Sequence, residues 1–494
     1  MSAANAQLIR STLIYVAIGF LPVAANFLLA PVYTRFMPPD EYALVGLATL
    51  FQTFLTFFLS LSLDSAFSRI YFDYERKEKL KHAVLSTLLI TVVVISLLVT
   101  GILLLVGDSF FSIIFSNRIF RFTNIGYWVA INTFSNAIFL FFALLYRNEE
   151  KLKRFTLINL LYFIIPVIGT LAALIIFKTG ALGAIIGRAL GSILYIVILL
   201  GWYFRAHPPV FKSAYLRKAL KFSIPIIPYQ LMFAGFSNID RFMLEQNFTL
   251  HDFGVYNFAV MVTGLIPVFL NALGNATNPK IFRELANNGN LESVRKYNYL
   301  VLFLSTGVIC LSIAAVVPAM RLFINSEYAD SYLYFGTLFL SFLPYLHYLV
   351  YNVPLFFFGK TKVFPVIAFA ALLSGILFNK IAIPGLGIWA VCLSLYIIRG
   401  IQALAAFIYI VRYGYNRLPY VKHFNAVAGS ICLILVYNGV LFLHTRCGLL
   451  PIEIINLFPL VCFLLLSMLI YRNELRLLTA SIRHLGKRNL FSRN

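Results

Sequence analysis

The charges of this chain are confined to short segments between long apolar stretches, and this arrangement restricts its fold more than any motif does. About fourteen stretches reach the roughly 20 apolar residues that a helix needs to cross a bilayer. They lie near residues 12–33, 42–63, 83–106, 124–145, 155–177, 181–203, 222–244, 253–276, 297–320, 331–358, 363–383, 386–411, 424–444 and 452–471. The short alternating segments of a transmembrane barrel are absent from the sequence. The pattern therefore predicts an all-α membrane protein with about 14 transmembrane helices.

The basic residues alternate between the two sides of this predicted array. Of the 40 Lys and Arg residues, 30 lie in every second gap and at the chain ends, six in the other gaps and four inside apolar stretches. Loops rich in Lys and Arg stay in the cytoplasm, which places both termini there. The net charge of +22 thus lies beside the membrane. Anionic lipids are its expected partners, and nucleic acid is not.

The composition also argues against a catalytic role. The mean hydropathy of +0.87 and a charged fraction of 12% exclude an ordinary soluble domain. No loop between predicted spans exceeds roughly twenty residues, far below the size of an independently folded domain. We find no nucleophile elbow, phosphate loop, metal-ligand spacing or carboxylate pair in a loop. The sequence favours a transporter over an enzyme and predicts no cofactor and no metal.

Two halves of the chain resemble each other. Pro22 and Arg35 match Pro228 and Arg241, each at an offset of 206 residues. Six spans per copy preserve orientation, so the halves would be parallel repeats that rock about a central cavity. The predicted domains are a six-helix bundle at 1–221, a second at 222–423, and an appended helix pair with a basic tail at 424–494.

Two arginines lie well inside predicted spans, and they are the first candidates for binding a substrate. Arg399 is near the middle of its span, and Arg188 is in the outer third of its span, one residue away from a seam formed by Gly183, Gly187 and Gly191. A cation at this depth is costly unless it faces water, protein or an anion. The functional interpretation is a cavity-facing site for an anionic group. The alternatives are an interhelical tie or a side chain that snorkels to the interface.

Other polar residues have weaker patterns. Arg35 and Arg241 end equivalent spans, where they would either anchor the helix or recruit phosphate at the outer mouth. Asp64, Asp240 and His347 are candidates for binding a coupling proton or sodium ion, but each is isolated in the sequence. For His347, a buried hydrogen-bonded histidine is the alternative.

Prolines interrupt two equivalent spans. Pro22 lies in the first span, and Pro225 and Pro228 lie in the seventh. Proline bends a helix and leaves a carbonyl without its donor, which is tolerated next to protein or a wet cavity. We expect these spans to act as gating helices. A static kink is the alternative.

An ordered set of segments resembles a known family of transporters. The segments are 222–228 (FSIPIIP), 240–244 (DRFML), 253–256 (FGVY), 31–36 (PVYTRF), 39–42 (PDEY) and 322–329 (LFINSEYA). They are similar to segments of the polysaccharide and oligosaccharide flippases of the Wzx type, in the superfamily of the MATE multidrug exporters and the lipid II flippase. Ala43 departs from that pattern, which has a Gly there, whereas Gly254 keeps it in the second copy.

The resemblance implies a V-shaped pair of six-helix bundles around a cationic cavity. It implies a flippase of the bacterial inner membrane that moves a polyprenyl-pyrophosphate-linked oligosaccharide to the outer leaflet for surface polysaccharide biosynthesis. Arg399 and Arg188 would then hold pyrophosphate or acidic sugars, and a polysaccharide polymerase and glycosyltransferases would be partners. One alternative is an ion-coupled, MATE-like multidrug exporter, which would need acidic cavity residues. The other is a membrane glycosyltransferase or polymerase, which would need acids in a large outer loop.

Overall fold

A computed structural model describes residues 29–74, 77–115, 121–286, 291–413, 424–447 and 451–470, together with Ile18 and Phe27. These residues are almost entirely helical, and none of them forms a strand. The longer helices of the first half are α2 (Pro39–Ser60), α3 (Leu63–Ile70), α4 (Glu78–Ile114), α5 (Tyr127–Asn148), α6 (Leu152–Leu171), α7 (Gly180–Ala206), α8 (Ser213–Ser223) and α9 (Ile227–Asn247). They are followed by α10 (Leu250–Thr263), α11 (Leu265–Ala286), α12 (Leu291–Phe323), α13 (Ser331–Leu340), α14 (Phe342–Phe357), α15 (Val363–Leu386), α16 (Ile388–Arg412), α17 (Phe424–Cys447) and α18 (Ile452–Ile470).

The helices confirm the predicted class of protein. Within the described residues, 12 helical segments are long and apolar enough to cross a membrane, and a shorter apolar helix covers Ile452–Leu465. The first predicted span, 12–33, lies mostly outside the described residues. The chain is thus an all-α, multi-pass membrane protein, and the expected number of about fourteen spans is close to what is observed.

The chain divides into two compact units, residues 1–257 and 258–494. Each unit is described by itself below. The domain limits predicted after residues 221 and 423 stay predictions.

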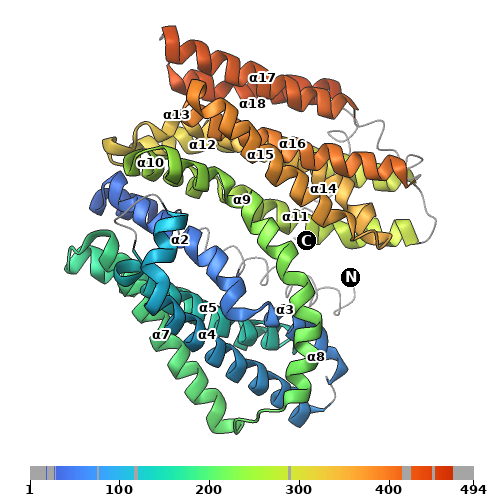
Figure 1. Ribbon diagram of the computed structural model, residues 1–494. Helices are drawn as coiled ribbons and strands as arrows, with labels where there is room; N and C mark the ends of the chain where they lie inside the picture. Colours follow the sequence, from blue (N-terminus) through green and yellow to red (C-terminus); the bar gives the residue numbers. More distant parts are fainter. Residues whose placement is uncertain are drawn as a thin grey trace, which may run out of the picture. The chain divides into compact units, whose positions relative to one another are not determined.

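In the first unit, α5 is the central helix and contacts α2, α4, α6 and α7 (Figure 1). Its Phe141 and Phe142 are fully buried. Phe141 meets the ring of Phe67 at 5.8 Å, and Phe142 meets that of Tyr203 at 5.2 Å, both edge to face. This geometry is favoured by aromatic quadrupoles. The aromatic core holds α3, α5 and α7 together.

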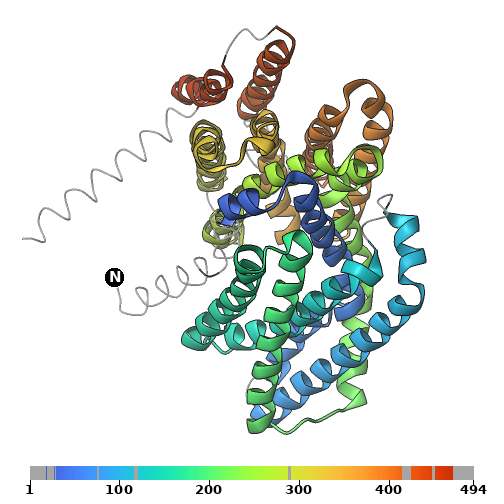
Figure 2. The same ribbon diagram turned by 90° about the vertical axis from the view of Figure 1, so that its left-hand side faces the viewer.

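Helices α6 and α7 form a tight hairpin, seen as the teal and green pair in Figure 2. A Cβ on Gly187 would lie 2.3 Å from the carbonyl oxygen of Gly169, and one on Gly191 would lie 2.8 Å from Cα of Pro166. Small residues let helix backbones approach closely in membranes, where apolar side chains give no hydrophobic advantage. The predicted glycine seam is confirmed as a helix contact at these two positions.

Replacing Gly187 by Ala should lower stability, because the added methyl group meets backbone atoms that cannot move away. We expect a loss of about 1–3 kcal/mol, the usual cost of overpacking. Gly201→Ala on the same helix is the matched control, since nothing lies within 4 Å of its would-be Cβ. Thermal unfolding in detergent measures both variants. Equal melting temperatures would contradict the close approach of α6 and α7.

In the second unit, α16 packs on α14 and α15, and α18 packs on α12 and α17. Gly336 on α13 leaves room for the hydroxyl of Tyr437 on α17, which a Cβ would meet at 1.7 Å. The same hydroxyl donates to Oδ1 of Asn456 on α18 at 2.8 Å. This hydrogen bond joins the two helices of the C-terminal pair, and a 2.8 Å hydrogen bond from Oγ1 of Thr337 on α13 to Oδ1 of Asn438 on α17 joins the pair to its unit.

Candidate functional site

A polar cavity of about 230 Å³ opens inside the first unit beside Arg188. Gln52 of α2, Asn132 and Asn136 of α5, and Asn159 of α6 bring four amide side chains to it, and Arg188 comes from α7. Ionised carboxylates are absent from the lining among the described residues. Such a wall offers many hydrogen-bond donors and one full positive charge.

The start of α7 is fixed by a side chain from α2. The backbone N–H of Ala181 donates to Oε2 of Glu41 at 2.9 Å, so a carboxylate meets the positive end of the helix dipole. Gly180 makes the turn with a φ of +61°, and a Cβ there would collide with the same carboxylate. Glu41 and the glycine seam together determine which face of α7 carries Arg188 into the cavity.

The cavity wall is ordered by contacts among its own residues. Nδ2 of Asn132 donates to Oε1 of Gln52 at 3.1 Å. The rings of Phe139 and Tyr162 stack at 3.9 Å with an interplanar angle of 5°. No described residue gives Arg188 a hydrogen-bond or ion-pair partner, and its side chain is exposed. The guanidinium is therefore available to an anion, which it can bind through two parallel hydrogen bonds.

The other arginines predicted as substrate-binding residues lie elsewhere. Arg399, in the second unit, donates from Nη1 to Oγ of Ser341, and its Cζ lies 3.8 Å from the ring centroid of Phe342. These contacts tie α16 to the start of α14.

Arg241 on α9 is half-buried, with Nη1 3.4 Å from Oδ1 of Asn238, and Arg35 is exposed. Within the first unit, the cavity is lined by Arg188 and by neither Arg35 nor Arg241.

The three candidates for ion coupling differ in their surroundings. Asp240 is buried and accepts a 2.8 Å hydrogen bond from the hydroxyl of Tyr256. His347 is buried and has Nε2 3.1 Å from Oγ of Ser430, the contact expected of a structural histidine. Asp64 is half-buried at the start of α3, outside the candidate spans. Burial raises the pKa of the Asp64 carboxyl, and hydrogen bonds from backbone N–H groups and Ser65 oppose this shift only in part.

The prolines predicted to gate the transporter fall at a helix break. Pro225 lies in a short 3-10 turn, Ile224–Ile226, between α8 and α9, and Pro228 lies in the first turn of α9. Both are exposed. Pro22 lies outside the described residues. A break of this kind can act as a hinge, because its backbone has fewer helical hydrogen bonds to lose.

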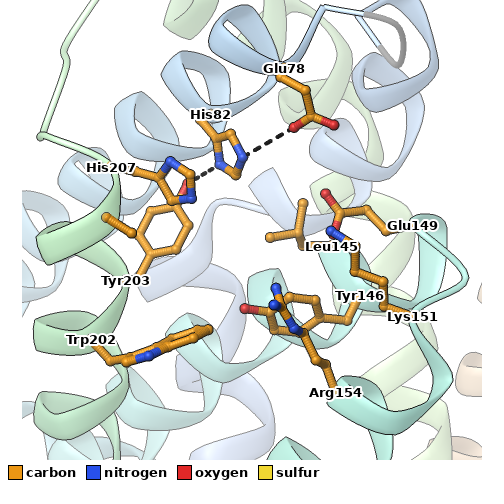
Figure 3. A pocket seen from close by; sticks show the side chains of 11 residues that line it. Glu78, His82, Leu145, Tyr146, Glu149, Lys151, Arg154, Trp202, Tyr203 and His207 are labelled. Carbon is orange, nitrogen blue, oxygen red and sulfur yellow. Dashed lines mark hydrogen bonds and ion pairs between the residues drawn. The ribbon is translucent and has the colours of Figure 1, made fainter.

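A second cavity, of about 280 Å³, lies in the first unit between α4, α5, α6 and α7 (Figure 3). The ring of His82 lies 3.4 Å from Glu78, contacts the hydroxyl of Tyr203 at 2.7 Å, and stacks on His207 at 3.7 Å. Ligand atoms of Glu78, His82 and Glu149 lie within 4.8 Å of one another, close enough for a metal ion.

An ammonium group already neutralises the acids of this cluster. Nζ of Lys81 lies 3.0 Å from Glu78 and 2.6 Å from Glu149, and the Lys81 side chain is 2% exposed. A metal ion would have to displace this cation, so the donor set fits a structural ion-pair cluster better than a metal centre.

The amide groups of the cavity beside Arg188 were not identified from the sequence. Asn132 and Asn136 lie four residues apart on α5, but Gln52 and Asn159 are on two other helices, so no spacing along the chain joins all four. A longer pattern of this kind occurs in the other half, where Asn271 and Asn275 lie at the end of the predicted span 253–276 and Asn278 follows just beyond it at helical spacing. Three amides on one face of an apolar helix indicate a polar neighbour.

Comparisons with known proteins agree on the fold. A family model described as "Polysaccharide biosynthesis protein" matches residues 8–284. Among solved structures, the chain resembles lipid II flippase MurJ in an inward closed conformation at 16% identity and a TM-score of 0.63, covering 94% of this chain and 100% of that one. No curated protein gives a significant match.

Two transporters of the MOP superfamily are also similar. An inward-facing multidrug resistance MATE transporter gives 15% identity and a TM-score of 0.65 over 84% of this chain and 99% of that one. A transporter from Pyrococcus furiosus, whose binding pocket is described as having reverse polarity, gives 16% identity and a TM-score of 0.59 over 84% and 96%. At these identities the likeness shows the fold alone.

Proposed function

This chain belongs to the polysaccharide biosynthesis protein family, and from that premise we propose that it is a flippase for a polyprenyl-pyrophosphate-linked oligosaccharide. It carries the glycan from the cytoplasmic to the outer leaflet by alternating access and supplies surface polysaccharide biosynthesis. Its own residues catalyse no covalent step.

The cavity beside Arg188 is the observation that carries this proposal. It pairs a guanidinium, which has no partner among the described residues, with a wall of amides and without carboxylates. Pyrophosphate fits the guanidinium, and sugar hydroxyls fit amides, which both donate and accept. A cationic drug would meet repulsion in the same place. The cavity chemistry therefore favours an anionic, hydroxyl-bearing substrate.

The proposal gives a substrate-binding role to each of four arginines. Arg188 and Arg399 bind the pyrophosphate in the two halves of the protein, and Arg35 and Arg241 recruit it at the outer mouth. The prolines at positions 22, 225 and 228 let their helices bend during the cycle. The lipid tail stays in the bilayer throughout.

The setting follows from charge and family. The excess of Lys and Arg in alternate segments supports cytoplasmic termini in a bacterial inner membrane. The polymerase and glycosyltransferases of the same polysaccharide pathway are the proposed partners.

Reconstitution tests the proposal directly. Purified protein in liposomes should transfer a pyrophosphate-linked glycan between leaflets, measured as loss of accessibility to an external lectin. It should not accumulate a cationic dye under a proton gradient. Dye transport without glycolipid transfer would replace the flippase with an exporter. Chain elongation of the glycan by the pure protein would instead indicate a polymerase.

Asp64 gives a pH prediction. Because burial raises the pKa of its carboxyl in the folded protein, the folded state holds this proton more tightly than the unfolded chain does. Stability should therefore fall as the pH rises from about 4 through the folded pKa. Asp64→Asn should remove this loss and melt slightly higher than the wild type at pH 7, with the difference vanishing below pH 4. Identical pH profiles in melting experiments would contradict it.

A further inference from the structure

The second unit holds a larger cavity, of about 430 Å³, between α11, α12 and α14. Its volume is within the range of roughly 300–1,000 Å³ that is typical of small-molecule sites. Five asparagines line it: Asn271, Asn275, Asn278, Asn298 and Asn352. None of its described lining residues is charged. Its chemistry is therefore neutral and polar, unlike that of the cavity beside Arg188.

Two of these polar groups lack a hydrogen-bond partner in the part of the chain that the structure describes. Nδ2 of Asn298 and Oδ1 of Asn352 are buried and have no hydrogen-bond partner among the described residues. Asn298 as a whole is only 2% exposed. An unsatisfied buried amide costs about 1–3 kcal/mol, and the bilayer offers it no water. Such groups point to a ligand that completes their hydrogen bonds.

The backbone of α11 adds an acceptor at the same place. Pro279 lies inside the helix and lines the cavity. Because proline has no N–H, the carbonyl of Asn275 loses its usual helical donor. Asn271, Asn275 and Asn278 share one helix face through their i, i+4 and i+7 spacing. One side of the cavity thus presents a row of amides together with a backbone carbonyl.

Aromatic rings supply an apolar surface beside these amides. Phe282 and Phe356 both line the cavity, with ring centroids 6.3 Å apart and planes at 14°. The C–H face of a sugar ring packs on an aromatic face, while its hydroxyls both donate and accept hydrogen bonds. An ammonium or a phosphate would find no opposite charge here. The combination suits a neutral sugar.

We infer that this asparagine-lined cavity binds a neutral, hydroxyl-rich sugar unit of the transported glycan. The inference rests on the proposed flippase function and assigns the sugar to a place separate from the arginine that holds pyrophosphate. The cavity then selects glycans by their uncharged hydroxyl and acetamido groups.

Binding to the purified protein tests this separately from transport. Lipid-linked oligosaccharide is extracted from cells that make it, and mild acid releases the free glycan, which has no pyrophosphate. Titration calorimetry in detergent should detect binding of this released glycan to the wild type. Asn275→Leu and Asn271→Leu should each weaken it at least tenfold. Asn425→Leu is the matched control, because Asn425 is exposed on α17 and does not line the cavity.

Two further measurements make each outcome decisive. Melting temperatures show that the variants are folded, and Asn275→Gln serves in place of Asn275→Leu if the latter is not. Arg205→Ala, which removes an exposed arginine that lines neither cavity, should bind the released glycan as the wild type does. The inference is overturned if the wild type does not bind the glycan, so that the cavity holds water only, or if the asparagine variants bind it unchanged. Failure of the flippase proposal would look different, since binding would persist while transfer between leaflets was absent.

Discussion

Replacing Lys81 by Met should destabilise the folded protein by about 3–5 kcal/mol, the loss seen when one partner of a buried ion pair is removed. The Lys81 side chain is 2% exposed and that of Glu149 is 6% exposed, with 2.6 Å between Nζ and Oε1. Without the ammonium, Lys151 is the one cation that Glu149 keeps among the described residues, and its side chain is 48% exposed with Nζ 2.9 Å from Oε2. An exposed cation in water compensates a buried carboxylate poorly. The variant should therefore melt well below the wild type in detergent.

Two matched variants separate charge from packing. Lys151→Met removes the exposed partner of the same carboxylate and should lower the free energy of unfolding by less than about 1 kcal/mol. The double variant Lys81→Met with Glu149→Leu removes both buried charges and should recover most of the lost stability, because apolar residues replace buried pairs well. A single Lys81→Met variant as stable as the wild type would show that the pair is solvated. A double variant no better than the single one would show that the loss comes from packing.

The fold was largely predictable because its strongest determinant is local in the sequence. Each span is a continuous apolar stretch, and the bilayer allows such a stretch little other than a helix. The glycine seam was also visible, because Gly187 and Gly191 recur every four residues, and its packing against α6 is what the structure contains. The sequence pattern does not predict which distant segments contact each other. Lys81 lies in one of the basic segments between predicted spans, yet its partner Glu149 lies 68 residues away along the chain.

The candidate site was predictable only in part, for the same reason. Arg188 was identified by its depth in a span and its position one residue from the seam, and it lines a cavity. Arg399 meets the same criterion and contacts Ser341 and Phe342, and its role in binding pyrophosphate stays a prediction. Depth in the membrane indicates that a cation needs a partner, but it does not say whether that partner is a ligand, a hydroxyl or a ring. Only the packing of other helices decides between them.

Arg188→Ala should reduce the rate of glycolipid transfer by about 10- to 150-fold. A charge-assisted hydrogen bond contributes about 1.5–3 kcal/mol, and each 1.4 kcal/mol is a factor of ten. The loss should be large because no other Lys or Arg lines this cavity among the described residues, so no neighbouring cation can substitute. Arg188→Lys keeps the charge without the bidentate geometry, so its transfer rate should lie between those of the wild type and Arg188→Ala. Transfer is measured in liposomes, with each variant's melting temperature recorded beside it.

Arg205→Ala provides the matched comparison on the same helix. Arg205 is exposed in the last turn of α7 and does not line the cavity, so its loss should leave transfer unchanged. If Arg188→Ala transferred glycolipid at the wild-type rate, the guanidinium would be serving the hairpin and not the substrate. A fall in melting temperature without a fall in transfer rate would lead to the same conclusion. If Arg188→Ala and Arg205→Ala lost transfer equally, the effect would reflect total positive charge, and the cavity would not be the site where pyrophosphate is held.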